Sequence, residues 1–323
     1  MRMFLKKLTL IALAAGLGAT GASAQDWPNR PVTLIVAAGA GGGTDFTGRL
    51  LAAGLEEKFG QPFNVVNRAE GGGIAGITEL ANAEPDGYTI GILFNYAPYK
   101  FLGMGNLTSD SFTPIAQYNF DSAAVHVKGN SDIQSLDQVI DRLKDDPKSL
   151  KVGCGATCPS SWSSALSTTL IDQGIDIREM IWVPNAGAAG GLQELVAGGV
   201  DVLTASVPEA AALIDAGEVR PLAVLSAERL APFPDVPTAG EQVEGAQPGG
   251  VFRAMTGPAG LPEDIASQLE MAMKEIYDSE DFQKAMKDRG FGLQYRDRTA
   301  LLEWMKIHEK DTETVLRAAG IVQ

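Results

Sequence analysis

Four glycine-rich loops constrain the fold of this 323-residue chain more than any other feature of its sequence. Each loop follows a short apolar run that is typical of a buried strand, and helical patterns begin beyond the loops. The loops occupy residues 38–45, 71–73, 153–159 and 184–191. This repetition predicts an α/β fold with a largely parallel sheet. Ligands of such sheets bind beyond the carboxyl ends of the strands, so two early and two central loops predict a cleft between two lobes.

The first loop shows the pattern most clearly. Residues 32–37 are apolar and β-branched, which predicts a buried strand, and apolar side chains recur at helical spacing from Phe46 to Phe59. Thr44 or Asp45 is expected to cap this helix, and Gly60 to end it. Further strands are expected at 63–67, 88–94, 123–127, 150–152, 180–183, 200–204 and 222–225, and helices at 74–83, 135–144, 162–171 and 192–197. A linker at 247–250 precedes a mostly helical segment, 261–320.

The loop at 41–45 is expected to bind an anion. Glycine lets the backbone approach a ligand closely, and the start of a helix presents free N–H groups and the positive end of a dipole. The formal net charge is −14. Because the overall field of such a protein repels anions, local dipoles must attract the ligand. We therefore expect one carboxylate of the ligand to dock at Gly41–Asp45, against the helix that follows.

Composition and motifs argue against several other classes of protein. Nucleic-acid binding needs clustered Lys and Arg, and an acidic chain does not dock on an anionic membrane. Two histidines and two cysteines argue against a zinc or haem site, so we expect neither metal nor cofactor. The first loop lacks the third glycine of the dinucleotide-binding motif, and the next strand ends at Asn67 rather than at an acid. The chain shows neither an acid–base pair nor a nucleophile beside a base, so we do not expect an enzyme.

The first 24 residues predict a signal peptide. Arg2, Lys6 and Lys7 form a basic start, residues 8–17 are apolar, and Ala22-Ser23-Ala24 is a cleavage signal. Cleavage after Ala24 would begin the mature chain at Gln25 and change the formal charge to −17, because three basic residues leave. The mature protein is expected in the periplasm.

Two cysteines lie four residues apart, at Cys154 and Cys158. Export would favour a disulfide between them, and so small a loop would mainly shape the local backbone. Two unpaired, buried thiols are the alternative. A redox site is a third interpretation, which the CxxxC spacing disfavours because redox motifs are CxxC.

A series of further motifs runs in order along essentially the whole mature chain. The motifs lie at 41–45, 49–51, 67–68, 71–73, Gly76, 83–89, 112–116, Pro184 with Gly187, 198–202, 220–224, 234–238 and 257–262. Pro85-Asp-Gly-Tyr-Thr89 and Pro234-Asp-Val-Pro-Thr238 are the most specific pair. Together these motifs resemble the Bug-type periplasmic receptors of tripartite tricarboxylate transporters.

The resemblance implies a two-lobed, type II periplasmic binding protein of the Venus-flytrap kind. Such receptors bind small organic anions, usually carboxylates, and deliver them to a large and a small membrane subunit. We expect a monomer with a signal peptide at 1–24, a first lobe at 25–122, a second lobe at 123–246 and a return to the first lobe at 247–323.

The resemblance also implies where the ligand lies. Backbone N–H groups and ordered waters near the first glycine loop would hold one carboxylate, and loops of the other lobe would select the rest of the ligand. The first lobe is expected to contribute Gly41, Gly42, Gly43, Thr44, Asp45, Gly72, Asn95, Tyr96 and Phe252. The second lobe is expected to contribute Ser160, Ser161, Trp162, Asn185, Gly187, Thr204 and Ser206. Trp162 has two open interpretations, core residue or cleft wall.

The chain departs from the family pattern at several cleft positions, so the usual ligands do not carry over. The departures are Ala40, Ala69-Glu70, Cys158, Trp162, Asn185-Ala186 and Phe252. The alternatives are a receptor for another class of transporter, a sensor, or an exported enzyme.

Overall fold

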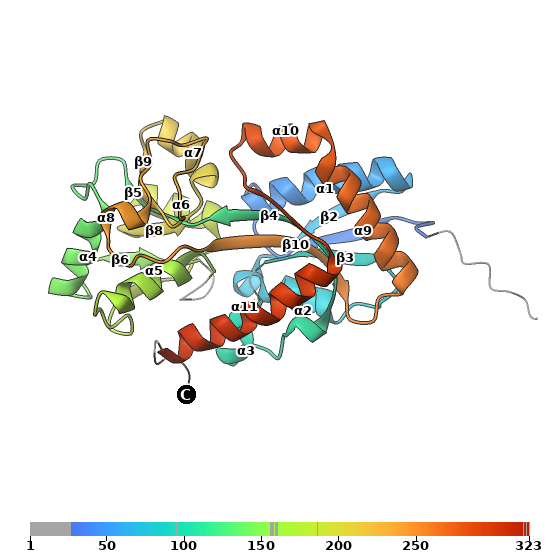
Figure 1. Cartoon of the computed structure of the whole chain (residues 1–323), viewed down its shortest axis with the longest axis horizontal. Helices are drawn as coiled ribbons and strands as arrows, with labels where there is room; N and C mark the ends of the chain where they lie inside the picture. The colour runs from blue at the N-terminus through green and yellow to red at the C-terminus, as the bar shows by residue number, and fades with distance from the viewer. Residues whose placement is uncertain are drawn as a thin grey trace, which may run out of the picture.

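Two β-sheets covered by helices divide the molecule into two lobes (Figure 1). The computed structural model describes residues 27–94, 96–155, 158, 161–185, 187–318, 320 and 322. The expected signal peptide lies outside them. In this described part of the chain, no helix combines the length and apolar character needed to cross a membrane.

The first lobe is built on six strands. They are β1 (Val32–Val36), β2 (Phe63–Asn67), β3 (Thr89–Leu93), β4 (Phe112–Ser122), β10 (Gly250–Pro258) and β11 (Leu293–Arg296), in the order β11-β4-β10-β3-β1-β2. Helices α1 (Gly43–Phe59), α9 (Glu263–Asp278) and α10 (Glu280–Asp288) pack on one face. Helices α2 (Ile74–Ala81), α3 (Ala97–Phe101) and α11 (Arg298–Ala318) pack on the other. Short 3-10 helices lie at Glu70–Gly73 and Ser109–Ser111.

The second lobe is built on five shorter strands. They are β5 (Ala124–Lys128), β6 (Lys151–Gly153), β7 (Ile181–Val183), β8 (Val202–Ala205) and β9 (Val219–Val224), in the order β7-β6-β8-β5-β9. The helices around them are α4 (Leu136–Asp145), α5 (Ser161–Asp172), α6 (Ala188–Ala197), α7 (Val207–Asp215) and α8 (Ala239–Gln242). Each lobe buries apolar clusters of its own, which is what a separately packed layer requires.

Two neighbouring strands carry the chain between the lobes. β4 continues through Ala123 into β5, and β10 returns from the second lobe beside it (Figure 1). The pair is antiparallel and hydrogen-bonded from Gly250 opposite Ser122 to Pro258 opposite Phe112. Register shifts lie at Arg253/Ala254 and Met255/Thr256. The lobes are therefore joined by a two-stranded ribbon.

The fold confirms the α/β class and the two lobes, but the expectation of a largely parallel sheet is wrong. β1 is parallel to β2 and β3, whereas β10 is antiparallel to β3 and β4. The chain that returns from the second lobe enters the sheet against the direction of its neighbours. The expected linker at 247–250 is partly wrong too, because β10 begins at Gly250. The lobe boundaries at 122/123 and 246/247 stay a prediction.

Candidate ligand-binding site

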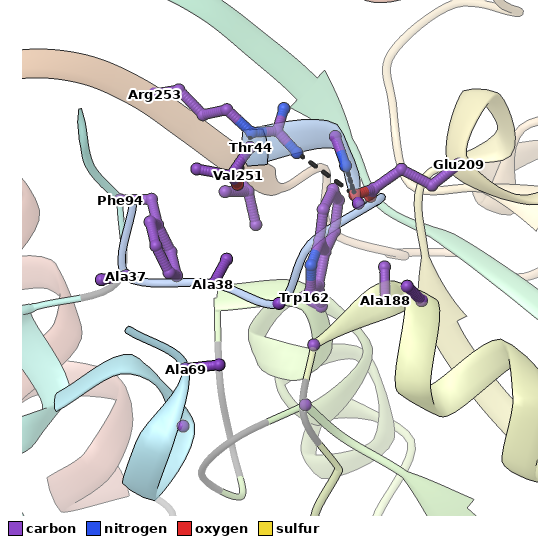
Figure 2. A pocket seen from close by; sticks show the side chains of 17 residues that line it. Ala37, Ala38, Thr44, Ala69, Phe94, Trp162, Ala188, Glu209, Val251 and Arg253 are labelled. Carbon is purple, nitrogen blue, oxygen red and sulfur yellow. Dashed lines mark hydrogen bonds and ion pairs between the residues drawn. The ribbon is translucent and has the colours of Figure 1, made fainter. Parts of the chain in front are cut away.

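A small cavity lies between the two lobes, at the carboxyl end of β1 (Figure 2). Its volume is about 50 Å³. The first lobe contributes Ala37, Ala38, Gly39, Gly42, Gly43, Thr44, Ala69, Gly72, Phe94, Val251 and Arg253. The second lobe contributes Gly155, Trp162, Gly187, Ala188, Ala189 and Glu209. The lining is mostly small and apolar, and its charged side chains are Arg253 and Glu209.

The first glycine loop brings the start of helix α1 to this cavity. Gly42 is the N-cap residue in an extended conformation, and Gly43 is the first helical residue. The expected caps are therefore wrong, since Thr44 and Asp45 already lie inside the helix. A Cβ atom on Gly43 would lie 2.7 Å from Nη2 of Arg253 and 2.8 Å from Oε1 of Glu209. Only glycine lets these side chains approach the backbone at this position.

The amide of Gly43 already holds a carboxylate. It donates a hydrogen bond of 2.8 Å to Oε1 of Glu209, a residue of helix α7 in the other lobe. The hydroxyl of Ser206, the N-cap residue of α7, lies 3.0 Å from Oε2 of the same carboxylate. In a capping box, the glutamate at this position reaches back to the start of its own helix. Here one carboxylate oxygen of Glu209 contacts the Ser206 side chain at the start of its own helix, and the other reaches across to the start of α1.

Arg253 connects the cavity to a buried polar network. Its guanidinium is 1% exposed and forms an ion pair with Asp121. It also donates to the side-chain oxygens of Thr44, at 2.9 Å, and Asn119, at 2.6 Å. A longer ion pair, 3.5 Å, joins it to Glu209. Buried charges persist only where such partners compensate them, so β4, β10, α1 and α7 are tied together at this point.

Burial sets the charge balance of this network. Burial raises the pKa of Glu209 above its ordinary value, although the charge of Arg253 acts in the opposite direction. Burial alone would lower the pKa of Arg253, but the negative charges of Asp121 and Glu209 have the larger combined effect and raise this pKa above its ordinary value. Arg253 therefore stays positive, and Asp121 suffices to neutralise it. An ionised Glu209 gives the cavity an excess of one negative charge.

Asp45 shapes the first loop rather than the cavity wall. Its carboxylate accepts hydrogen bonds from the amide of Gly41, at 2.9 Å, and from the side chains of Arg49 and Asn67. Burial alone would raise the pKa of Asp45, but these hydrogen bonds outweigh it and leave the pKa below its ordinary value. Asp45 therefore stays ionised and holds the loop in place.

The loop that carries the cysteines forms part of the opposite wall. Cys154 and Cys158 are joined as a disulfide, with their Cα atoms 5.5 Å apart. Gly155, within this loop, and Trp162, four residues after Cys158, line the cavity. Trp162 is 8% exposed and also packs against the core of the second lobe, so both interpretations of this residue describe it in part.

The structure brings some of the expected site residues together and separates others. Gly42, Gly43, Thr44, Gly72, Trp162 and Gly187 line the cavity. The lining does not include Gly41, Asp45 or Ser206. The hydrogen bond between Gly41 and Asp45 holds the first loop, and that between Ser206 and Glu209 holds the Glu209 carboxylate. Asn95, Ser160 and the side chain of Ser161 lie outside the part of the chain that is described.

The remaining expected residues are buried elsewhere. The hydroxyl of Tyr96 donates to the carbonyl of Met305, at 3.3 Å, inside the first lobe. Phe252 packs edge-on against Trp304 and lines a separate cavity. Thr204 is 1% exposed, and its hydroxyl lies 3.5 Å from the carbonyl of Gly153. The side-chain amide of Asn185 is buried and lies outside the cavity lining.

Sequence reasoning missed Glu209, Arg253 and Phe94 at the cavity. A signal for Glu209 was present, because Ser206 and Glu209 have the spacing of a helix start just after a strand. No local pattern marks Arg253, whose role depends on partners from three distant segments.

Comparison with known proteins places the chain in a family. The model of the tripartite tricarboxylate transporter family receptor, TctC, matches residues 47–321. A curated relative from Bordetella pertussis, a protein of the UPF0065 group, is 32% identical over 88% of each chain. Protein BugT of the same organism is 27% identical over 90% of this chain and 89% of its own. The matched family is one of receptors, which are binding proteins rather than enzymes, and this confirms the expectation that the chain is not an enzyme.

Solved structures of similar proteins share the fold. A Rhodopseudomonas palustris protein solved with adipate has a TM-score of 0.81 at 27% identity, over 91% of this chain and 99% of its own. MatC from Rhodopseudomonas palustris, solved with bound malate, has a TM-score of 0.80 at 26% identity, over 90% of this chain and 100% of its own. The periplasmic binding protein BugD has the same fold, with a TM-score of 0.80 at 24% identity over 92% of this chain and 99% of its own.

Proposed function

Because the chain belongs to the family of tripartite tricarboxylate transporter receptors, we propose that it binds a small organic anion in the cleft between its lobes. The ligand carries a carboxylate, and the receptor delivers it from the periplasm to the large and small membrane subunits of a transporter. Two similar proteins were solved with the carboxylates adipate and malate, which supports this class of ligand.

One observation carries the proposal. The start of α1 faces the cavity, and its first amide, that of Gly43, is hydrogen-bonded to a carboxylate oxygen. A backbone amide at the positive end of a helix dipole suits a carboxylate without needing a mobile lysine or arginine. Hydrogen bonds to charged groups contribute roughly 1.5–3 kcal/mol each, so two or three can offset the cost of ordering a small ligand.

The walls of the cavity narrow the class of ligand further. Phe94, Trp162 and Val251 are apolar, and alanine and glycine supply most of the remaining lining. Such walls favour a compact acid with an aliphatic or aromatic body over one with many hydroxyl groups, whose hydrogen bonds would be lost on burial.

A thermal-shift screen of the mature protein, residues 25–323, tests the proposal. The panel pairs each acid with its amide, for example malate with malamide and adipate with adipamide. A ligand at 100 times its Kd stabilises the folded state by about 2.7 kcal/mol, which shifts the melting temperature measurably. We expect at least one acid to raise the melting temperature and its amide to leave it unchanged.

Native mass spectrometry of the purified protein complements the screen, because it weighs any ligand retained from the cell. An amide that stabilises as well as its acid would refute carboxylate recognition. A retained ligand without an acidic group would refute it as well.

A further inference from the structure

The side-chain carboxylate of Glu209 occupies the position that the proposed function assigns to the carboxylate of the ligand. Its Oε1 atom lies 2.8 Å from the amide nitrogen of Gly43 and 3.5 Å from Nη2 of Arg253. Figure 2 shows the side chain extending from the second lobe toward Arg253 and Thr44 of the first. The side chain is 7% exposed, so its position is defined by contacts rather than by solvent.

Both lobes hold this carboxylate in position. Gly43 and Arg253 contact one oxygen from the first lobe, and Ser206 contacts the other from the second lobe. Ser206 also caps α7 by accepting a hydrogen bond from the amide of Glu209, at 3.3 Å. The cap fixes the first turn of α7 and thereby directs Glu209 across the cleft.

A ligand carboxylate and Glu209 cannot use the same donor together. A backbone amide carries a single hydrogen, and a strong hydrogen bond is close to linear. The charges oppose joint occupancy as well. Asp121 already neutralises Arg253, so a ligand carboxylate beside an ionised Glu209 would meet a like charge.

We propose that Glu209 is an internal competitor of the ligand, and that it sets which anions the receptor accepts. A ligand carboxylate gains the Gly43 amide only by displacing Glu209 from it. Displacement also removes a hydrogen bond between the lobes, so an accepted anion must replace that link with contacts of its own. The inference rests on the proposed function for the nature of the ligand, but the link between the lobes can be measured without one.

The test compares the wild-type protein with two variants at this position. Glu209→Ala removes the competitor, and Glu209→Gln keeps its shape while removing the charge. Glu218→Gln is the matched control, because it removes one negative charge from an exposed site just beyond α7. Titration calorimetry with malate and with adipate gives the affinities. Small-angle X-ray scattering in buffer without organic anions gives the radius of gyration.

We expect both Glu209 variants to bind the anion at least tenfold more tightly than wild type, and Glu218→Gln to match wild type. Without organic anions, the Glu209→Ala variant is expected to have a larger radius of gyration, because a link between the lobes is lost. Weaker binding by the Glu209 variants would show that Glu209 recognises the ligand, and unchanged binding would show that its role is structural. Either result overturns the inference, while the proposed function stands. If neither wild type nor any of the variants binds malate or adipate, the proposed function fails for these two acids. In that case, an unchanged radius of gyration of the Glu209→Ala variant overturns the inference.

Discussion

At the scale of single residues, Gly43 differs from its neighbour Gly42 in the space around it. A Cβ atom on Gly43 would lie within 2.9 Å of atoms of Arg253, Glu209 and Phe291, whereas on Gly42 its nearest neighbour would be 3.7 Å away. From the sequence the two glycines are equivalent members of one loop. The packing that distinguishes them comes from residues more than 150 positions further along the chain.

Replacing Gly43 by Ala is therefore expected to destabilise the protein and to weaken binding. Overpacking of this kind costs about 1–3 kcal/mol. The added methyl group also occupies space that a carboxylate on the Gly43 amide needs, so affinity should fall at least tenfold. Urea unfolding measures the first effect, and calorimetry with an acid from the screen measures the second. The control is Gly240→Ala in helix α8, an exposed position outside the cavity lining where an added Cβ atom would have the Thr238 hydroxyl as its nearest neighbour, at 3.9 Å. It should be as stable as wild type and bind equally well; equal behaviour of the two variants would contradict the assignment.

The two histidines of the chain predict a loss of stability in mild acid. Burial lowers the pKa of His126 to about 4 and that of His308 to about 4, from an ordinary value of 6.5. The folded state keeps both rings neutral while the unfolded state protonates them. Their contribution to stability is complete above pH 6.5 and is lost as the pH falls toward 4.

Between pH 6.5 and 5, each histidine should lower the free energy of unfolding by up to roughly 2 kcal/mol, at 1.36 kcal/mol per pH unit. This range lies above the ordinary pKa values of the carboxyl groups, which limits their contribution. Urea unfolding at pH 7.5, 6.0 and 5.0 measures the loss, and the His126→Gln variant should lose less than wild type. A stability that is constant over this range would show that the rings are accessible to protons.

At the scale of secondary-structure elements, the apolar strands of the two lobes could be predicted, whereas β4 and β10 could not. Buried strands such as β1, which is apolar at every position except Thr33, can be recognised in the sequence. β4 instead buries Gln117, Asn119 and Asp121, which a rule based on polarity assigns to solvent. These side chains are buried because Arg253 and Arg296 reach them from other segments. Patterns within one segment cannot reveal such partners.

The disulfide loop is expected to affect the cavity wall more than the stability of the fold. A loop of five residues limits the entropic gain from the bond to about 2 kcal/mol. In protein exported to the periplasm and kept unreduced, an alkylating reagent should label neither Cys154 nor Cys158, and it should label both after reduction. Quantitative labelling before reduction would favour the alternative of two free thiols.

The Cys154→Ser/Cys158→Ser double variant tests the position of this loop. Loss of the bond should lower the free energy of unfolding, measured in urea, by no more than about 2 kcal/mol, and the variant should bind the anion more weakly. The physical reason is that Gly155, within the loop, and Trp162, shortly after it, line the cavity. Unchanged affinity would show that the loop keeps its shape without the bond.

At the scale of the whole molecule, the predicted export signal determines where the protein works. Mass spectrometry of the protein from a periplasmic extract should find Gln25 at the N-terminus and a chain of 299 residues. An Ala24→Arg variant, which disrupts the cleavage signal, should accumulate as the longer precursor. Soluble protein in the cytoplasm that still begins with Met1 would contradict the prediction.

The ribbon formed by β4 and β10 limits how the two lobes can move. Two hydrogen-bonded strands bend easily across their plane, but they resist sliding because sliding would break their shared register. The lobes are therefore expected to approach each other by bending of this ribbon rather than by sliding past each other. One dye on each lobe would record the bending as a change in a single distance.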